Sequence, residues 1–173
     1  KMYDSMANVT IYNKVAARLR LGENFFYVDS LQHALEEERK AYRMAMKAGD
    51  SNLLSYVRQN LASTFEEMGE KDSCLYYARL AYDLNAANRF SCLLTFASAY
   101  ISVDSLNQAF SLLKQAMPKT AEDRYSVFYF QSQAAMKAQD FKSAKSFSDS
   151  AYHYLEDMYR TALQGKAAYY TSF

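Results

Sequence analysis

The stretch RLRLGENFFYVDSLQHALEEERKA, residues 18–41, decides the fold, because the spacing of its small residues recurs along the rest of the chain. Gly22 is followed by small residues at positions 62, 97, 132 and 167, one step of 40 residues and then three steps of 35. The same steps carry Ala34 and Ala41 onto further small residues. A period of this length is typical of helical repeat proteins. The three series are Gly22, Ala62, Ala97, Ser132 and Ala167; Ala34, Cys74, Ala109 and Ala144; and Ala41, Ala81, Ala116 and Ala151.

Large residues keep the same period and provide an independent check on it. The third residue after each member of the Gly22 series is aromatic in four units of five, and the residue before it is large and apolar in the first three units. The repeat therefore fades towards the C-terminus. The two sets are Phe25, Phe65, Tyr100, Ala135 and Tyr170, and Leu21, Leu61, Phe96, Gln131 and Lys166.

Local signals predict two helices in each unit. In the second unit, apolar residues at helical spacing run over 53–65 and stop before Gly69, which can adopt the left-handed conformation that ends helices. Asp72 or Ser73 can then cap a second helix over 75–84. We predict the other turns at Asp29-Ser30, Asp104-Ser105 and Gln139-Asp140, and connections between units at Gly49-Asp50, 85–88 and 118–120.

The composition supports an all-α fold, because four Gly and one Pro are too few for a turn-rich β fold. The small residues would allow neighbouring helices to approach to about 8–10 Å. We therefore predict a single domain over 1–173 that consists of antiparallel helix hairpins. Its units span approximately 14–49, 51–86, 88–119 and 121–156, followed by a half unit at 158–173.

Charge and cysteine content limit the functions to consider. Lys and Arg total 20 against 19 Asp and Glu, which gives no electrostatic reason to expect nucleic acid as a partner. The longest uncharged run, residues 90–103, is shorter than the ~18 residues that a membrane span needs. Cys74 and Cys92 provide no disulfide framework, so the compartment, cytoplasmic or periplasmic, stays open.

The small and large residues together resemble the tetratricopeptide repeat, a helix-turn-helix hairpin of about 34 residues. The usual Trp is absent, and Arg18 and Arg58 stand in its place. The step of 40 residues is similar to that of the longer-repeat arrays in bacterial regulators. The signature is read in Leu21-Gly22, Phe25, Ala34 and Ala41; in Leu61-Ala62, Phe65, Gly69, Cys74 and Ala81; in Phe96-Ala97, Tyr100, Ala109, Ala116 and Pro118; and in Ala144 and Ala151.

This resemblance implies a right-handed superhelix whose concave face binds an extended peptide or a partner's helix. The first helix of each hairpin would line that groove with aromatic, polar and acidic side chains, which favour a partner segment that carries Lys or Arg. The groove residues predicted from the register are Leu19, Glu23, Phe26, Tyr27, Tyr56, Gln59, Ser63, Glu66, Glu67, Leu94, Ser98, Ile101, Tyr129, Gln133, Met136 and Lys137.

The leading functional hypothesis is a non-catalytic protein-interaction scaffold. One alternative is the sensory segment of a larger bacterial signalling or transcription-regulating protein, and another is self-association through the terminal helix around Tyr169 and Tyr170. One subgroup of the resembled family holds a C-terminal carboxylate in a clamp. Asn60 matches a clamp position, but Leu19 and Glu23 stand where Lys and Asn are needed, which argues against that ligand.

The sequence shows no catalytic or metal-binding constellation, so we predict no enzyme activity, cofactor or metal site. His33 and His153 lie outside metal-type spacings. The acidic run 36–38 precedes Arg39-Lys40, which indicates a solvated, internally paired helix face. Cys74 occupies a small-residue position, where cysteine behaves as a small hydrophobe.

Overall fold

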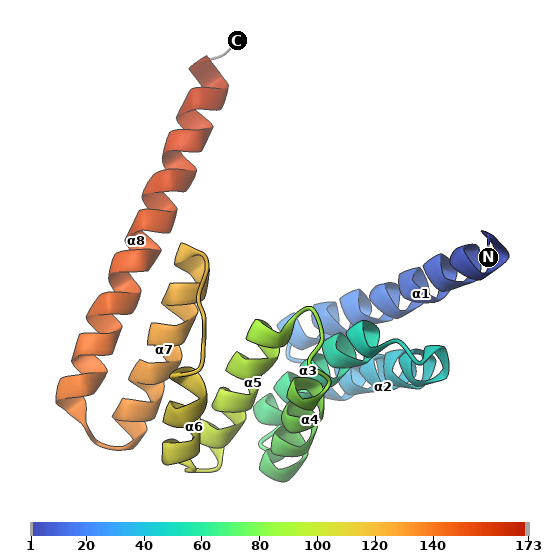
Figure 1. The fold of residues 1–173 in the computed structure, drawn as a ribbon, viewed down its shortest axis with the longest axis horizontal. Coiled ribbons are helices and arrows are strands. Elements are labelled where there is room, and N and C mark those ends of the chain that lie inside the picture. The colour runs from blue at the N-terminus through green and yellow to red at the C-terminus, as the bar shows by residue number, and fades with distance from the viewer. Residues whose placement is uncertain (1, 172–173) are drawn as a thin grey trace. The chain divides into compact units, whose positions relative to one another are not determined.

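The computed structural model describes the backbone of residues 2–171 and the side chains of residues 10–164. This backbone forms eight α-helices and no strand, which confirms the all-α prediction (Figure 1). Three pairs of consecutive helices, α1 with α2, α3 with α4 and α7 with α8, pack on each other as hairpins. The helices are α1 (Met2–Tyr27), α2 (Leu31–Ala48), α3 (Ser51–Glu67), α4 (Lys71–Asp83), α5 (Arg89–Ser102), α6 (Leu106–Leu113), α7 (Ala121–Lys137) and α8 (Phe141–Thr171).

The backbone turns keep the period of the sequence. A residue with positive φ precedes each of α2, α4, α6 and α8, at Asp29 (57°), Gly69 (74°), Asp104 (61°) and Gln139 (59°). These residues are 40, 35 and 35 positions apart, as the small residues are. Positive φ ends one helix and lets the chain reverse before the next begins. The predicted turns are therefore confirmed at the level of individual residues.

Helix ends between the hairpins also follow the sequence signals. Gly49 ends α2 with φ 64°, and the Asp50 side chain caps α3 by accepting hydrogen bonds from the backbone N–H groups of Asn52 and Leu53. The predicted cap of α4 is wrong, because α4 begins at Lys71 and the residue before it supplies no side-chain cap. Gly69 already reverses the chain, so α4 starts earlier than the first capping side chain.

The small residues lie where helices meet. Ala34, Ala41, Ala62 and Ala97 have no exposed surface, and Ala81 is 1% exposed. Each is too short to keep two helix backbones apart, which agrees with the close packing predicted for these positions. These five members of the small-residue series lie in the core, whereas Ala116 and Ser132 are half-buried.

The contacts divide the chain into an N-terminal unit, Lys1–Val103, and a C-terminal unit, Asp104–Phe173. In the N-terminal unit α3 contacts both α1 and α5, so the first helices of successive hairpins lie side by side. α2 and α4 pack against this row of first helices. The right-handed superhelix and the single domain over 1–173 stay predictions.

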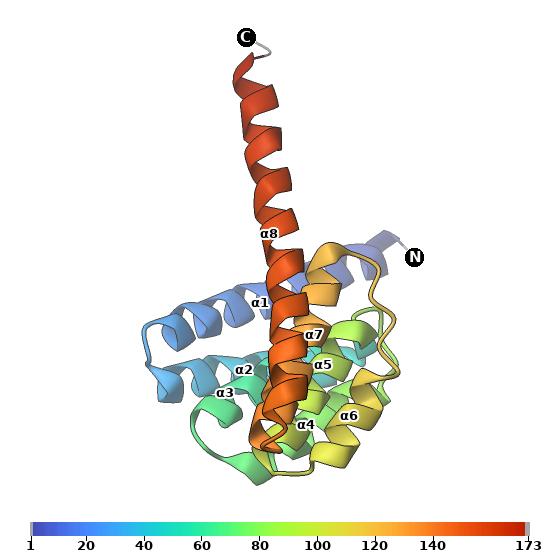
Figure 2. The ribbon, with the colours of Figure 1, turned by 90° about the vertical axis from the view of Figure 1, so that its left-hand side faces the viewer.

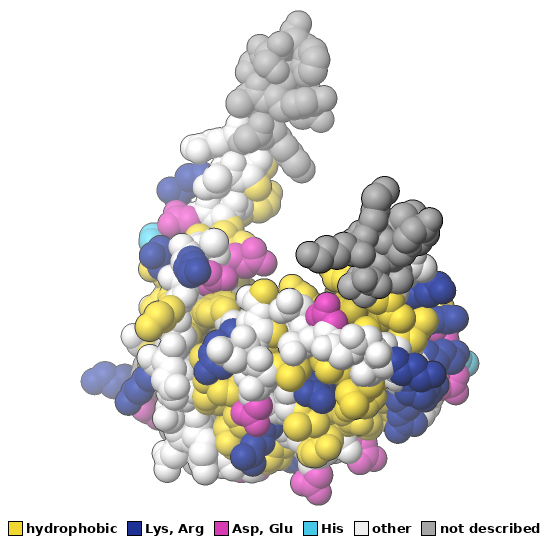
Figure 3. Space-filling view, turned by 45° about the vertical axis from the view of Figure 1, so that its right-hand side comes forward, with side chains coloured by type: hydrophobic (Ala, Val, Ile, Leu, Met, Phe, Trp, Pro, Cys, Tyr) yellow, Lys and Arg dark blue, Asp and Glu magenta, His cyan; other side chains and the backbone are white. Residues whose placement is uncertain are grey.

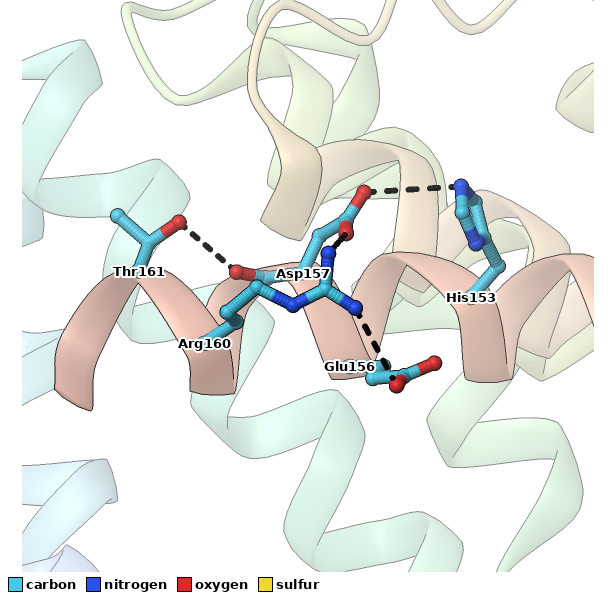
Figure 4. A network of polar contacts seen from close by, with 5 residues as sticks. All are labelled: His153, Glu156, Asp157, Arg160 and Thr161. Carbon is cyan, nitrogen blue, oxygen red and sulfur yellow. Dashed lines mark hydrogen bonds and ion pairs between the residues drawn. The ribbon is translucent and has the colours of Figure 1, made fainter. Parts of the chain in front are cut away.

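The C-terminal unit differs from the predicted arrangement in its last helix. We expected a break near residue 157, but α8 runs unbroken over Phe141–Thr171 and continues past α7 (Figures 1 and 2). No Gly or Pro stands at the expected junction. Ion pairs of Asp157 with His153 (3.6 Å) and Arg160 (3.7 Å), and of Arg160 with Glu156 (3.4 Å), span it instead (Figure 4). Such pairs, one turn apart, stabilise a continuous helix.

Two further predictions concern membrane spans and the terminal helix. Within residues 2–171, no helix combines the length and apolar character that crossing a bilayer requires. Tyr169 and Tyr170, on which the predicted self-association depends, lie outside the described side chains.

Candidate functional site

Eight of the predicted groove residues of the N-terminal unit line a furrow between α1 and α3. Two pockets of about 350 and 370 Å³ lie along it and share Glu23, so together they form one elongated surface, which we call the α1–α3 furrow. Half of the predicted residues line these pockets. They are Leu19, Glu23, Phe26 and Tyr27 from α1, and Tyr56, Ser63, Glu66 and Glu67 from α3.

The furrow combines exposed aromatic rings with carboxylates. Tyr27 is 82% and Tyr56 is 45% exposed, so both rings are accessible to a partner. We call the pocket at the Tyr27 end the acidic pocket, since its lining includes four Glu side chains and, among the described residues, neither Lys nor Arg. Figure 3 shows apolar side chains exposed between charges of both signs on one face of the molecule.

The carboxylate of Glu38, from α2, forms part of the wall of the acidic pocket. Glu38 is only 2% exposed. Its Oε1 accepts a hydrogen bond of 2.8 Å from the Thr64 hydroxyl, whereas its Oε2 is buried without a hydrogen-bond partner. Gly22 makes room for this side chain, because a Cβ at Gly22 would lie 3.2 Å from Glu38 Cγ. A buried carboxylate oxygen without a protein donor is uncommon, and it indicates a place where a water, an ion or a ligand group can bind.

The prediction that the acidic run 36–38 is a solvated face is wrong for two of its three residues. Glu36 is exposed, but Glu37 and Glu38 are buried. Glu37 pairs with Arg18 of α1 (2.7 Å) and with Lys40 (2.5 Å), so the internal pairing was correctly expected. Arg18 and Lys40 therefore pair with Glu37, whereas Glu38 accepts a hydrogen bond from Thr64 of α3.

Burial sets the protonation of Glu38. It raises the pKa of this carboxyl from its ordinary 4.5 to about 7, and the nearby negative charge of Glu23 acts in the same direction. The hydrogen bond from Thr64 opposes the rise because it stabilises the charged form. Glu38 therefore changes charge near neutral pH.

The sequence contains a signal for Glu38 that the groove prediction missed. The repeat steps carry position 38 onto Ala78 and Leu113, which are 0% and 2% exposed. The second and third units thus place buried apolar residues where the first has a carboxylate, although the fourth has the exposed Ser148, and this difference is the sign of a special environment at Glu38. Two more lining residues of the acidic pocket lie outside the predicted set. Asn60 had been noted only as a match to a clamp position, and Thr64 carried no comparable signal.

Two of the four remaining groove residues of α3 and α5, Gln59 and Ser98, form hydrogen bonds between the two segments. Gln59 donates to the Ser91 hydroxyl and accepts from Asn88 (3.1 Å), and Ser98 donates to Glu66 (2.8 Å). These hydrogen bonds join the two helices across the row of first helices. Leu94 and Ile101 of α5 are half-buried, so this part of the predicted groove is more structural than open.

The other four predicted residues lie on α7, in the C-terminal unit. Tyr129 is 42% and Met136 is 54% exposed, and Gln133 and Lys137 are exposed as well. Lys137 forms an ion pair of 3.0 Å with Asp104. Tyr129 stacks with Tyr125 at 6.1 Å between ring centroids. These residues form a separate surface within their own unit.

Both cysteine thiols are buried. Burial raises the pKa of Cys74 to about 12 and that of Cys92 to about 11. The thiolate is the reactive form, so we expect neither residue to react with the thiol reagent DTNB at about pH 8 while the protein is folded. Absorbance would show two thiols per chain only after denaturant is added. Rapid labelling of the folded protein would contradict the burial of these side chains.

The histidines occupy unrelated places. His33 shares a hydrogen bond of 2.9 Å with Ser30 and stacks on Phe25, whereas His153 pairs with Asp157 on α8. Among the described side chains, no three His, Cys, Asp or Glu are grouped as a metal site requires. The absence of enzyme activity, cofactor and metal stays a prediction.

Comparison with known proteins does not identify this chain. No family model matches it, and no curated protein sequence is significantly similar to it. The resemblance to tetratricopeptide repeats therefore stays a prediction from the residue pattern.

Proposed function

We propose that this chain is a non-catalytic protein-interaction module whose N-terminal unit binds an extended, basic segment of a partner protein along the α1–α3 furrow. The observation that carries the proposal is the furrow itself, in which two pockets share Glu23 and exposed aromatic rings lie beside carboxylates. Aromatic side chains in such places supply much of the binding energy of protein interfaces.

The shape of the furrow favours an elongated ligand over a compact one. Tyr56 lines one pocket and Tyr27 the other, and Glu23 lies between them. A segment that runs along α1 could place one side chain in each pocket. Rigid helices on both sides would hold these pockets in place without the ligand, which lowers the entropic cost of binding.

The charge of the acidic pocket favours a basic segment at this end of the furrow, whereas Arg20 lines the other pocket. Glu23 and Glu67 are exposed, and together with Glu66 they line the acidic pocket. Complementary charge speeds association and excludes acidic competitors. Ser98 already donates to Glu66, so Glu23 and Glu67 are the carboxylates we expect the partner to contact first.

The test is a selection of short random peptides on the immobilised protein, followed by fluorescence anisotropy with the selected sequences. We expect basic peptides, and we expect Tyr56→Ala to weaken their binding about tenfold, the effect of losing one anchoring aromatic side chain. Tyr76→Ala is the matched control, because Tyr76 is 58% exposed but lies on α4, outside the furrow. Selection of acidic peptides, or an equal loss of affinity in Tyr56→Ala and Tyr76→Ala, would refute the proposal.

A further inference from the structure

We propose that the acidic pocket is a receptor for a single lysine side chain, whose ammonium group binds the unpartnered Oε2 of Glu38. The inference rests on the proposed function and specifies it further, because it names the side-chain group of the partner that the furrow binds. The observation behind it is a carboxylate that is 2% exposed, forms part of a pocket wall and has one oxygen without a partner.

The number of free acceptors favours lysine over arginine. A guanidinium binds a carboxylate best through two parallel hydrogen bonds, one to each oxygen. At Glu38 the Thr64 hydroxyl already donates to Oε1, so Oε2, which is buried, is the oxygen without a donor. An ammonium group is a compact charge that needs one such oxygen and can direct its other N–H groups elsewhere.

The rest of the pocket suits a lysine side chain. Phe26 and Tyr27 provide apolar surface against which the methylene stem can pack, as lysine stems commonly do. Their ring faces also attract a cation. Asn60 and Ser63 line the same pocket and offer oxygen acceptors for the remaining N–H groups. Binding needs a side-chain adjustment at Glu38 to present Oε2, a common change when partners bind.

The charges around Glu38 agree with a cation in this place. From α1 the pocket is faced by Glu23, and from α3 by Glu66 and Glu67. On α2 itself, Glu37 is neutralised by Arg18 and Lys40. An ammonium at Oε2 would therefore offset the carboxylates that face the pocket without displacing an existing ion pair of Glu38.

The same geometry makes binding depend on pH. Glu38 has a pKa of about 7 in the unliganded protein, so it is mostly neutral at about pH 6 and mostly charged at about pH 8. Only the charged form attracts the ammonium, which stays protonated over this range. We expect the apparent affinity for a lysine peptide to rise about tenfold between these two pH values, with release of a proton on binding.

The experiment uses three capped alanine pentapeptides whose central residue is lysine, arginine or norleucine, titrated into the full chain and followed by NMR of the Asn60 and Thr64 amides. We expect the lysine peptide to bind several-fold more tightly than the others. Glu38→Gln should remove that preference and the pH dependence together. Glu36→Gln, an exposed neighbour on the same helix, should change neither.

Three results would overturn the inference: no binding of the lysine peptide, equal binding of lysine and norleucine peptides, or an unchanged lysine preference in Glu38→Gln. The pH series on the unaltered chain gives a further readout that needs no variant, and an affinity independent of pH would also contradict it. If peptides selected on the protein still lose binding in Tyr56→Ala, the furrow remains a peptide site and only the role of Glu38 is wrong.

Discussion

Glu38→Gln is expected to be more stable than the parent protein at about pH 8, by up to roughly 3 kcal/mol, and about equally stable near pH 5. The substitution keeps the size of the side chain and the acceptor for Thr64, whose hydroxyl lies 2.8 Å from Glu38 Oε1. It removes only the capacity to carry a negative charge in a buried place. The difference between the two proteins should therefore depend on pH.

The sign follows from where the proton is held. The pKa of Glu38 is raised from 4.5 to about 7 in the folded protein. Between these values the folded state keeps its proton and the unfolded state has lost it, so stability falls as pH rises. Above about pH 7 the folded state carries the buried charge and the loss is complete. Glutamine holds no titrating proton and avoids this loss.

Thermal unfolding followed by circular dichroism at several pH values would measure the effect. We expect the melting temperature of the parent to fall from about pH 5 to pH 8 relative to Glu38→Gln, by several degrees. Glu36→Gln is the matched control, because Glu36 is exposed on the same helix and should follow the parent at every pH. Parallel pH profiles of the parent and Glu38→Gln would show that Glu38 is not strained by burial.

Together with the ligand experiment, this prediction separates function from stability. If Glu38 served the fold, replacing it would destabilise the protein at every pH. We expect instead that one substitution stabilises the unliganded protein and abolishes lysine recognition. Functional sites commonly reduce stability in this way, because they hold charged groups ready for a ligand.

The helical repeat could be predicted from the sequence because its signals are local or periodic. The residues before α2, α4, α6 and α8 reverse the chain at the predicted turns, Asp29, Gly69, Asp104 and Gln139. The continuous α8 was missed because the repeat period was extended to a new unit after residue 157. No Gly or Pro there ends the helix. Extending a period is a weaker argument than a Gly or Pro signal.

The furrow was half predictable, for a physical reason. Helix periodicity tells which side chains of α1 and α3 face the same direction, and Glu23, Phe26 and Tyr56, which it groups together, all line the furrow. It does not tell which side chains of a neighbouring helix reach between them. Glu38 enters from α2 beneath Gly22, a contact between positions that no pattern within one helix connects.

The second large effect is expected at a helix contact of the N-terminal unit. Ala81 of α4 is 1% exposed, and α4 packs against both α3 and α5. Placing an indole there would force the helices apart or the side chain out of its preferred rotamers. We expect Ala81→Trp to cost about 3 kcal/mol or more, at the upper end for an overpacked core.

Chemical or thermal unfolding of Ala81→Trp would measure that cost, and Ala48→Trp is its control. Ala48 is exposed at the end of α2, so the same added volume can extend into solvent there. We expect a melting temperature lower by about 10 °C for Ala81→Trp and little change for Ala48→Trp. Equal stability of the two would mean that the small residues do not hold the helices together, and the repeat register would then fail. A loss of stability in Ala81→Trp alone would instead show that the periodic small residues determine how the helices pack. The same packing places Gly22 against Glu38.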